Sequence, residues 1–377
     1  MKQDKKKLVI CSPQLGLSPK SILGGEVFDR ETLLGFARKG IQVEIILPKH
    51  KHHDDNIKNW NISYLPISKF PAVLGNILFL PYLFKVFQKN NFKIIRVHQP
   101  QFIGISALIF KFFKRKVKII ATIHKFEEAN FGPLSKLINN LWDHIICDSE
   151  YAKSLIIENY GIKKSKILVV HNGAPNYLKP QKKDNMLVKK LNLEGKKVLL
   201  YMGLFIKRKN PLFLLDVLER LLTSQSDSIL IYWGEGPLKN RIIQKSKKLK
   251  IYEHIKIINP VFSKEKNKIH NIADIFVHPS LDEGLALAPI ESMACAKPIV
   301  ITNGNSASEL VESGINGFKC DKNNLNEWVD KLNILVSNTT LRNKMGQSSL
   351  SKIKEQFQWN LTVSKQYKLF QSLANDI

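Results

Sequence analysis

Two glutamates eight positions apart are the residues of this chain whose types and spacing most suggest chemistry. Glu283 and Glu291 both lie in the segment HPSLDEGLALAPIESMACAKP. Because carboxylates accept hydrogen bonds from hydroxyl groups, we expect Glu291 to hold a ribose and Glu283 a sugar. Two isolated glutamates are more often exposed side chains without a role. The surrounding segment decides between these interpretations.

The flanking sequence predicts a strand, a glycine-containing turn and a helix, in that order. Residues 272–280 form a branched apolar run typical of a buried parallel strand. Pro289 suits the first turn of a helix that ends near Cys295. Such an arrangement directs backbone N–H groups and the positive end of the helix dipole toward one spot. The sequence therefore predicts an anion site beside the two carboxylates, as a phosphorylated sugar donor requires.

The segment resembles the E-x(7)-E signature of the retaining glycosyltransferases of family 4, which have the GT-B architecture. Other motifs of that family occur in the expected order along nearly the whole chain. The resemblance implies an α/β protein with two doubly wound Rossmann-like domains facing across a cleft. We place an acceptor-binding domain at residues 1–180 and a nucleotide-sugar-binding domain at 181–351. A C-terminal helix at 352–377, with its helical segment from Lys352 to about Leu373, would cross back to the first domain.

Two motifs in the first half resemble parts of the family's donor site. Gly24 and Gly25 precede a helical pattern and resemble the loop whose backbone approaches the donor diphosphate, although a plain turn would also use glycine. His124 follows a predicted strand at 118–123, where open parallel sheets bind ligands. The family's histidine at the matching place contacts the donor sugar. The alternative is a partly buried histidine bonded to backbone, and His98 is a weaker candidate of the same kind.

The second half carries the cations that the resemblance assigns to the leaving diphosphate. Lys209 matches the family's lysine, but Leu204 stands where the family has an arginine directly after a glycine. The arginine's role must therefore pass to Arg208 or Lys207, or be absent. Three adjacent cations are otherwise usually a solvated loop.

The resemblance implies His124, Lys209 and Glu283 as the catalytic set. It also implies donor-binding positions in the glycine turns, the E-x(7)-E segment and the following loop, beside Gly24, Gly25 and Arg208: Gly234, Gly284, Leu285, Ala286, Leu287, Glu291 and Glu309. The family often has glycines where Asn305 and Ser306 stand. We expect no metal and no cofactor, and a UDP-sugar donor, with a GDP-sugar as second choice.

Composition limits the remaining choices. The 377 residues suit two domains, and the four cysteines lack metal-ligand spacing and indicate a reduced, cytoplasmic protein. The longest apolar run, residues 71–87, is interrupted and falls short of a membrane span. A net charge of +26 requires an explanation. Residues 107–118 combine bulky apolar and basic side chains, which favours peripheral binding to the anionic inner face of the plasma membrane. A lysine-rich surface over an ordinary core helix is equally compatible.

The function that the resemblance implies is retaining transfer of a hexose from a nucleoside diphosphate sugar to a glycan or lipid-linked acceptor. Cell-surface polysaccharide or lipopolysaccharide synthesis is the expected context. Three alternatives stay open at this point. A sugar-nucleotide epimerase of the same fold would share the nucleotide site, and a nucleic-acid-binding protein would explain the charge but shows no recognition motif. A polysaccharide-binding protein without catalysis would fit a site that Leu204 has inactivated.

Overall fold

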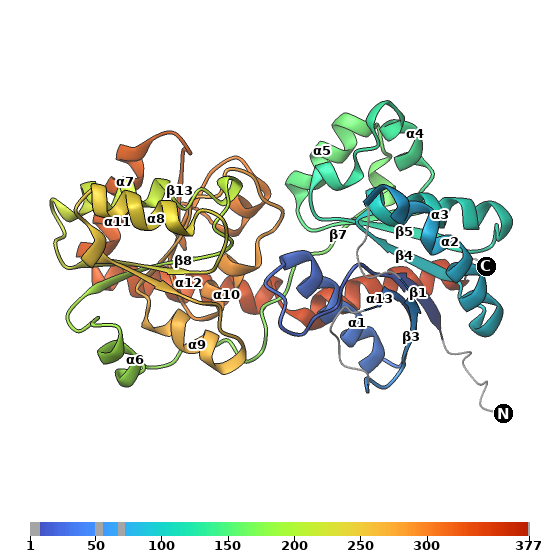
Figure 1. Cartoon of the computed structure of the whole chain (residues 1–377), viewed down its shortest axis with the longest axis horizontal. Coiled ribbons are helices and arrows are strands. Elements are labelled where there is room, and N and C mark those ends of the chain that lie inside the picture. Colours follow the sequence, from blue (N-terminus) through green and yellow to red (C-terminus); the bar gives the residue numbers. More distant parts are fainter. Residues whose placement is uncertain (1–7, 50–55, 67–71, 376–377) are drawn as a thin grey trace. The chain divides into compact units, whose positions relative to one another are not determined.

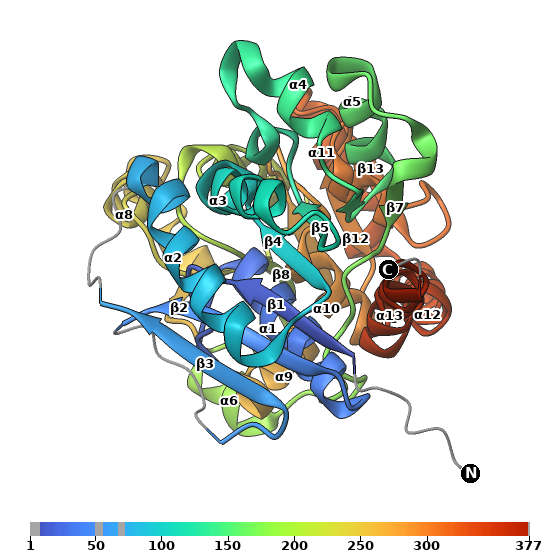
Figure 2. The same cartoon turned by 90° about the vertical axis from the view of Figure 1, so that its right-hand side faces the viewer.

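The computed structural model describes residues 8–49, 56–66 and 72–375 (Figures 1 and 2). The chain divides into two compact units. Unit 1 contains Met1–His171 together with Trp359–Ile377, and unit 2 contains Asn172–Gln358. Each unit is built on one parallel sheet with helices on both faces, which is the fold class that the sequence predicts.

Unit 1 has a seven-stranded parallel sheet of order β3-β2-β1-β4-β5-β6-β7. Its strands are β1 (Val9–Pro13), β2 (Gln42–Pro48), β3 (Trp60–Leu65), β4 (Ile94–His98), β5 (Lys118–Ile123), β6 (His144–Cys147) and β7 (Ile167–Val169). Its helices are α1 (Gly24–Arg38), α2 (Ala72–Asn90), α3 (Pro100–Phe113), α4 (Ser135–Asn140), α5 (Glu150–Tyr160) and α13 (Trp359–Asn375), with a short 3-10 helix η1 (Phe126–Ala129).

The strands of unit 1 are almost continuous apolar runs because helices cover both faces of the sheet. One core cluster joins the sheet to α2 and α3, and a second joins it to α1 and α13. In the second cluster the rings of Phe36 and Phe370 lie 5.1 Å apart. Helix α13 is therefore part of the core of unit 1, although it follows unit 2 in the sequence.

Unit 2 has a six-stranded parallel sheet of order β10-β9-β8-β11-β12-β13. Its strands are β8 (Lys197–Met202), β9 (Ser228–Trp233), β10 (Ile255–Ile258), β11 (Ile275–His278), β12 (Ile299–Thr302) and β13 (Gly317–Cys320). Its helices are α6 (Asn185–Lys190), α7 (Phe213–Leu222), α8 (Lys239–Lys248), α9 (Ser263–Ile272), α10 (Leu287–Ala294), α11 (Leu325–Ser337) and α12 (Thr339–Gln356), with 3-10 turns η4 (Lys207–Lys209) and η6 (Ser306–Leu310).

The chain reverses its direction of winding once in each sheet. In unit 1 this switch lies between β1 and β4, and in unit 2 it lies between β8 and β11. In open α/β sheets, ligands bind outside the carboxyl ends of the strands at such a switch point. The loops that follow β8 and β11 contain Lys209 and Glu283, and β4 ends at His98. The fold thus positions the predicted residues at the two switch points.

The structure differs from the sequence analysis at three places. Gly24 and Gly25 are the first two residues of α1 and do not precede it, since the first N–H groups of a helix are unpaired anyway and glycine costs little there. The single helix expected from Lys352 is two helices, α12 and α13. They are separated because Phe357 and Gln358 leave the helical conformation to pair with Ala174. The compact units divide at 171/172 and 358/359, whereas the sequence analysis predicts domain boundaries at 180/181 and 351/352.

Within the described ranges, no helix combines the length and apolar character needed to cross a membrane. The apolar run that begins at residue 71 corresponds mostly to α2, and Pro71 itself lies outside the described residues.

We expect Gly346→Ala to destabilise unit 2, although alanine is normally the better residue in a helix by about 1 kcal/mol. A Cβ at Gly346 of α12 would lie 2.2 Å from the carbonyl oxygen of Ala296, so the backbone after α10 must move. Overpacking of this kind costs about 1–3 kcal/mol, or a fall in Tm of roughly 2–10 °C. Thermal unfolding of Gly346→Ala and of the exposed neighbour Gln347→Ala measures it. Equal Tm values for both variants would contradict the close packing of α12 on α10.

Candidate functional site

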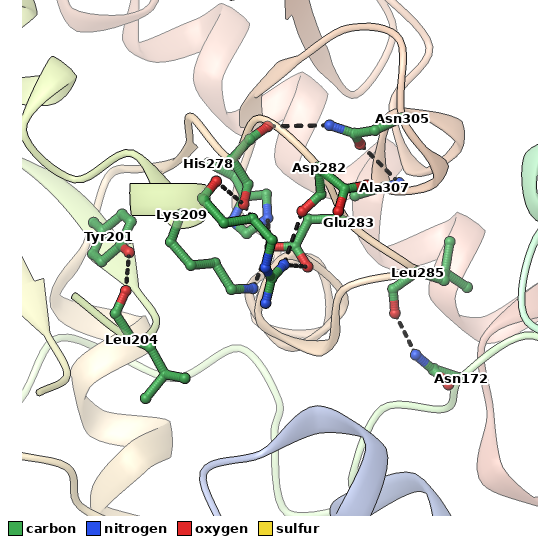
Figure 3. A network of polar contacts seen from close by, with 12 residues as sticks. Asn172, Tyr201, Leu204, Lys209, His278, Asp282, Glu283, Leu285, Asn305 and Ala307 are labelled. Carbon is green, nitrogen blue, oxygen red and sulfur yellow. Dashed lines mark hydrogen bonds and ion pairs between the residues drawn. The ribbon is translucent and has the colours of Figure 1, made fainter. Parts of the chain in front are cut away.

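Glu283 is a buried carboxylate held by two cations and a hydroxyl (Figure 3). Its Oε1 pairs with Nζ of Lys209 and accepts a hydrogen bond of 2.5 Å from Oγ of Ser280. Its Oε2 accepts from Nη1 of Arg208 at 3.0 Å. His278, the last residue of β11, has Nε2 3.6 Å from Oε1. The structure thus brings three of the predicted site residues, Glu283, Lys209 and Arg208, into one cluster.

The charges in this cluster are set by burial and by the neighbouring cations. Burial alone would raise the pKa of Glu283, but the charge of Lys209, then the neighbouring His278 and then the charge of Arg208 hold it well below the ordinary value. Burial lowers the pKa of His278, which therefore stays neutral near pH 7. The cluster carries two positive charges against one negative charge. This excess of positive charge suits an anionic ligand.

The turn that carries the two cations is supported by the glycine turn after β9. A Cβ at Gly234 would lie 2.0 Å from the carbonyl oxygen of Gly203, so only glycine lets the two loops approach. The N–H of Phe205 donates to the carbonyl of Glu235 at 2.8 Å, and the N–H of Leu281 donates to that of Arg208 at 2.9 Å. The close approach of Gly234 to Gly203 therefore helps to fix the conformation of the loop that leads to Arg208 and Lys209.

The structure shows where Leu204, which stands at the family's arginine position, and the nearby Arg208 lie relative to Glu283. The side chain of Leu204 points away from the Glu283 cluster, and its carbonyl accepts from the hydroxyl of Tyr201 at 2.9 Å (Figure 3). Arg208 reaches both Glu283 and the carbonyl of Asp282, the latter at 2.8 Å. Lys207 is exposed. Of the two candidates, Arg208 is the one that contacts the carboxylate.

Helix α10 begins immediately after this cluster and has an open amino end. Its N-cap residue is Ala286, and no side-chain hydrogen bond caps the described helix. The preceding residues Gly284 and Leu285 are buried, and the amide of Asn172 donates to the carbonyl of Leu285. Leu287 is the first residue of α10, and Pro289 lies in its first turn, as predicted. Uncapped N–H groups at a helix start are a favourable place for an anion.

Glu291 belongs to a different group of side chains from Glu283. Its carboxylate pairs with Nζ of Lys266 at 2.6 Å, and Nε2 of His270 lies 3.8 Å away. Lys266 also lies over the ring of Trp233, with Nζ 5.1 Å from the centroid. Burial would raise the pKa of Glu291, but the charge of Lys266 lowers it to about 2. Glu291, the residue expected to bind the ribose, is thus an ionised and buried carboxylate that is already paired with a lysine from α9.

The loop after β12 is tied to the Glu283 cluster through Asn305. Its Nδ2 donates to the carbonyl of Ser280 at 3.1 Å, and its Oδ1 accepts from the N–H of Ala307 at 3.0 Å (Figure 3). An amide side chain therefore fills a place where the family often has glycine. Glu309 lies further along, in η6, where its carbonyl accepts from Lys352 of α12 at 3.0 Å.

In unit 1, His124 follows β5 directly and is buried. Its Nδ1 lies 3.3 Å from Oδ2 of Asp148, and the ring of Phe28 meets it edge-on at 4.5 Å. Its Nε2 is buried and has no hydrogen-bond partner among the described residues. Burial lowers the pKa of His124, but the Asp148 and Glu128 carboxylates outweigh this effect and raise it. Such an unsatisfied nitrogen is costly unless a ligand pairs with it.

Several residues of these clusters were missed in the sequence analysis. Ser280, Lys266 and Asp148 all contact a predicted site residue. Asp148 could have been found, because it follows β6 directly and obeys the same strand-end rule as His124. Lys266 carries no such signal. In the parts of the chain that the structure describes, no group of three His, Cys, Asp or Glu side chains could hold a metal ion.

Two family models match the chain. Residues 182–351 match the model described as glycosyl transferases group 1, and residues 23–175 match that described as glycosyltransferase family 4. Each match falls almost wholly within one compact unit.

Related proteins are similar over different shares of their length. An uncharacterized glycosyltransferase of Methanocaldococcus jannaschii is 26% identical over 62% of this chain and 60% of its own. N-acetyl-alpha-D-glucosaminyl L-malate synthase of Bacillus anthracis is 23% identical over 98% of this chain and 97% of its own. UDP-Gal:alpha-D-GlcNAc-diphosphoundecaprenol alpha-1,3-galactosyltransferase of Escherichia coli is 24% identical over 72% of this chain and 73% of its own.

Solved structures share the fold over nearly the full chain. A glycosyltransferase from Rickettsia africae ESF-5 has a TM-score of 0.81 with 19% identity, covering 99% of this chain and 100% of that one. HepE of Anabaena, solved in complex with UDP-glucose, has a TM-score of 0.78 with 17% identity, covering 97% and 100%. At these identities the likeness establishes the fold alone.

We expect Glu291→Gln to lower stability in a pH-dependent way. The folded pKa of Glu291, about 2, lies below its ordinary value of 4.5. Its contribution, on the order of 3 kcal/mol, is therefore present above pH 4.5 and is lost as the pH falls toward 2. Urea unfolding should show that the free-energy gap between variant and wild type shrinks by roughly half from pH 5 to pH 3. The exposed Glu265→Gln serves as control, and a gap that stays constant with pH would contradict the pairing with Lys266.

Proposed function

Because this chain belongs to the group 1 and family 4 glycosyltransferases of the GT-B fold, we propose that it transfers a hexose from a nucleoside diphosphate sugar with retention of configuration. The observation that carries this proposal is the convergence of Lys209 and Arg208 on the buried carboxylate of Glu283, beside the uncapped start of α10. A diphosphate would bind to the two cations and the uncapped helix start. The carboxylate beside them would accept hydrogen bonds from sugar hydroxyls.

The proposed role of each group follows from its charge. When a diphosphate binds, Lys209 and Arg208 gain a more strongly charged partner than one carboxylate. Glu283 is then released in part to accept hydrogen bonds from the sugar hydroxyls. Donors that are already in place when charge develops on the leaving group lower the barrier most effectively. Lys209 is therefore the main electrostatic catalyst in this proposal, and Arg208 takes the place of the arginine that Leu204 replaces.

The transfer step needs no protein nucleophile. The bond between the anomeric carbon and the β-phosphate oxygen breaks, and the acceptor oxygen bonds to the same face of that carbon. The acceptor proton passes to the leaving phosphate, which keeps the balance of atoms and charge. In unit 1, His124 would offer its unsatisfied Nε2 to a hydroxyl of the transferred sugar. Glu291 would hold the ribose after exchanging its contact with Lys266.

The choice of donor and acceptor rests on relatives. HepE was solved with UDP-glucose, and the Escherichia coli relative is named for UDP-Gal and a diphosphoundecaprenol acceptor. We therefore favour a UDP-sugar, with a GDP-sugar as second choice. The acceptor is proposed to be a glycan or a lipid-linked oligosaccharide in the synthesis of a cell-surface polysaccharide.

An exposed apolar and basic surface on unit 1 supports a peripheral position at an anionic membrane. Phe112 and Phe113 at the end of α3 are 70% and 62% exposed, and Leu137 and Leu141 near the end of α4 are 62% and 50% exposed. Lys111 of α3 pairs with Asp143, which places the two helix ends close together. Unit 1 has 29 Lys and Arg against 14 Asp and Glu. Aromatic side chains among cations favour an anionic lipid interface.

Replacing Lys209 should weaken binding of UDP about 10- to 100-fold, because a charged hydrogen bond to phosphate is lost. Calorimetric titration with UDP and GDP should compare wild type, Lys209→Met and Lys207→Met. Lys207 lies on the same turn but is exposed, so its variant should bind within about 2-fold of wild type. Sugar transfer should be lost in Lys209→Ala and in Glu291→Ala. If wild type binds neither nucleotide, or if Lys209→Met binds as wild type does, the donor assignment is wrong.

Flotation with liposomes tests the membrane surface. Wild type should float with vesicles that contain anionic lipid at low salt and less at high salt, since salt screens the charges. Phe112→Ser with Phe113→Ser should reduce flotation several-fold by removing the apolar part. Met186→Ser, which changes an apolar side chain 79% exposed on unit 2, is the matched control. If the wild type floats at neither salt concentration, peripheral attachment is refuted.

A further inference from the structure

A second imidazole lies beside His124 and takes no part in the mechanism above. His98 is the last residue of β4, the strand that borders the switch point of the sheet in unit 1. The rings of His98 and His124 have centroids 5.2 Å apart and are inclined by 58°. The side chain of His98 is 5% exposed. A buried polar ring at the ligand-binding edge of a sheet requires an explanation.

A buried ion pair holds one side of this ring. Nδ1 of His98 lies 2.8 Å from Oδ2 of Asp29, and Oδ1 of Asp29 accepts from Nη1 of Arg96 at 2.5 Å. The side chains of Asp29 and Arg96 are both fully buried. Nε of Arg96 also donates to Oε1 of Gln366 in α13 at 3.4 Å. A carboxylate this close to Nδ1 favours a proton on that nitrogen and restrains the orientation of the ring, although the pair does not have the geometry of a hydrogen bond.

The other side of the ring faces the start of α1. A Cβ at Gly25 would lie 3.4 Å from both Cε1 and Nε2 of His98, so the imidazole edge lies about one methyl group away from the backbone of the first helical turn. Phe28, one turn later, packs edge-on against His124. His98 therefore lies beside both Gly25 and His124, the two features of unit 1 that the resemblance assigns to the donor. Asp29 lies on the same helix as Gly25 and Phe28 and pairs with His98.

We propose that His98 is a positioning residue, which Asp29 and Arg96 orient so that its ring fixes His124 and the first turn of α1 for the donor. The proposal rests on the proposed function for the role of His124 and Gly25. The cost of burying Asp29 and Arg96 is consistent with this role, because a buried ion pair gives little net stability compared with apolar side chains and is better suited to fixing geometry. No bond is made or broken at His98.

The charges around His124 make the proposal measurable in the free protein. The groups that face His124 are Asp148 after β6, Glu128 in η1, Asp29 in α1 and His98 at the end of β4. Loss of the Asp29 charge disfavours the imidazolium form of His124. Its titration midpoint should therefore fall. A residue with a merely structural role would change the unfolding temperature but not this midpoint.

We would titrate the histidine rings of 15N-labelled full-length protein by NMR, with and without UDP. Asp29→Asn should lower the midpoint of His124, and His98→Gln, which keeps the pair of Asp29 with Arg96, should release His124 into exchange between tautomers. Glu31→Gln, on the same helix beside Arg30 and Arg38, is the matched control and should leave His124 unchanged. UDP-glucose turnover should fall about 10-fold or more in kcat for His98→Gln, with KM changed less than about 3-fold.

The outcomes separate the two proposals. If His124 titrates identically in wild type, Asp29→Asn and His98→Gln, the positioning role is refuted whatever UDP does. If Asp29→Asn does not fold, His98→Gln alone decides the matter, by the state of the His124 ring. If the ring of His124 responds to both variants but UDP and GDP fail to bind, His98 is a positioning residue and the proposed donor chemistry is wrong.

Discussion

A carboxylate removed from water keeps its charge only when cations and donors surround it, and this constraint organises the candidate site of unit 2. Glu283 has its direct partners on two loops, and a third loop supports one of them. Lys209 and Arg208 come after β8, Ser280 lies after β11, and Asn305 after β12 holds Ser280 in turn. The close approach of Gly234 to Gly203 fixes the first of these loops. The parallel sheet is what brings the ends of its strands to one edge.

Unit 1 also contains a buried carboxylate that is paired with basic side chains. Asp29 is fully buried, and its partners Arg96 and His98 come from a single strand that borders the switch point. Alternate residues of a strand face the same side of a sheet, so Arg96 and His98 reach one carboxylate together. In both units, then, a buried acid orders the basic groups at the carboxyl edge. Only the cluster of unit 2 carries a surplus of positive charge, because in unit 1 Asp148 and Glu128 also lie beside the basic groups.

The sequence predicted the fold better than the detailed contacts. Periodicity and the residues at strand ends located β5, β11 and α10 and placed His124, Lys209 and Glu283 correctly on loops or at strand ends. The partner of Glu291 could not be predicted, since Lys266 is an ordinary lysine on a polar helix 25 residues earlier, and only the packing of α9 brings them together. The break between α12 and α13 was missed for a similar reason. It depends on pairing between Ala174 and Gln358, which are distant in sequence.

The position of α13 in the core of unit 1 affects the order in which the chain can fold during synthesis. Val363 and Phe370 fill that core, and Gln366 reaches Arg96 in its centre, yet all three are made after the whole of unit 2. The first 171 residues must therefore wait on the ribosome with an incomplete apolar face, while residues 172–358 already form a contiguous unit. Unit 1 can therefore complete its apolar core only after α13 has been synthesised.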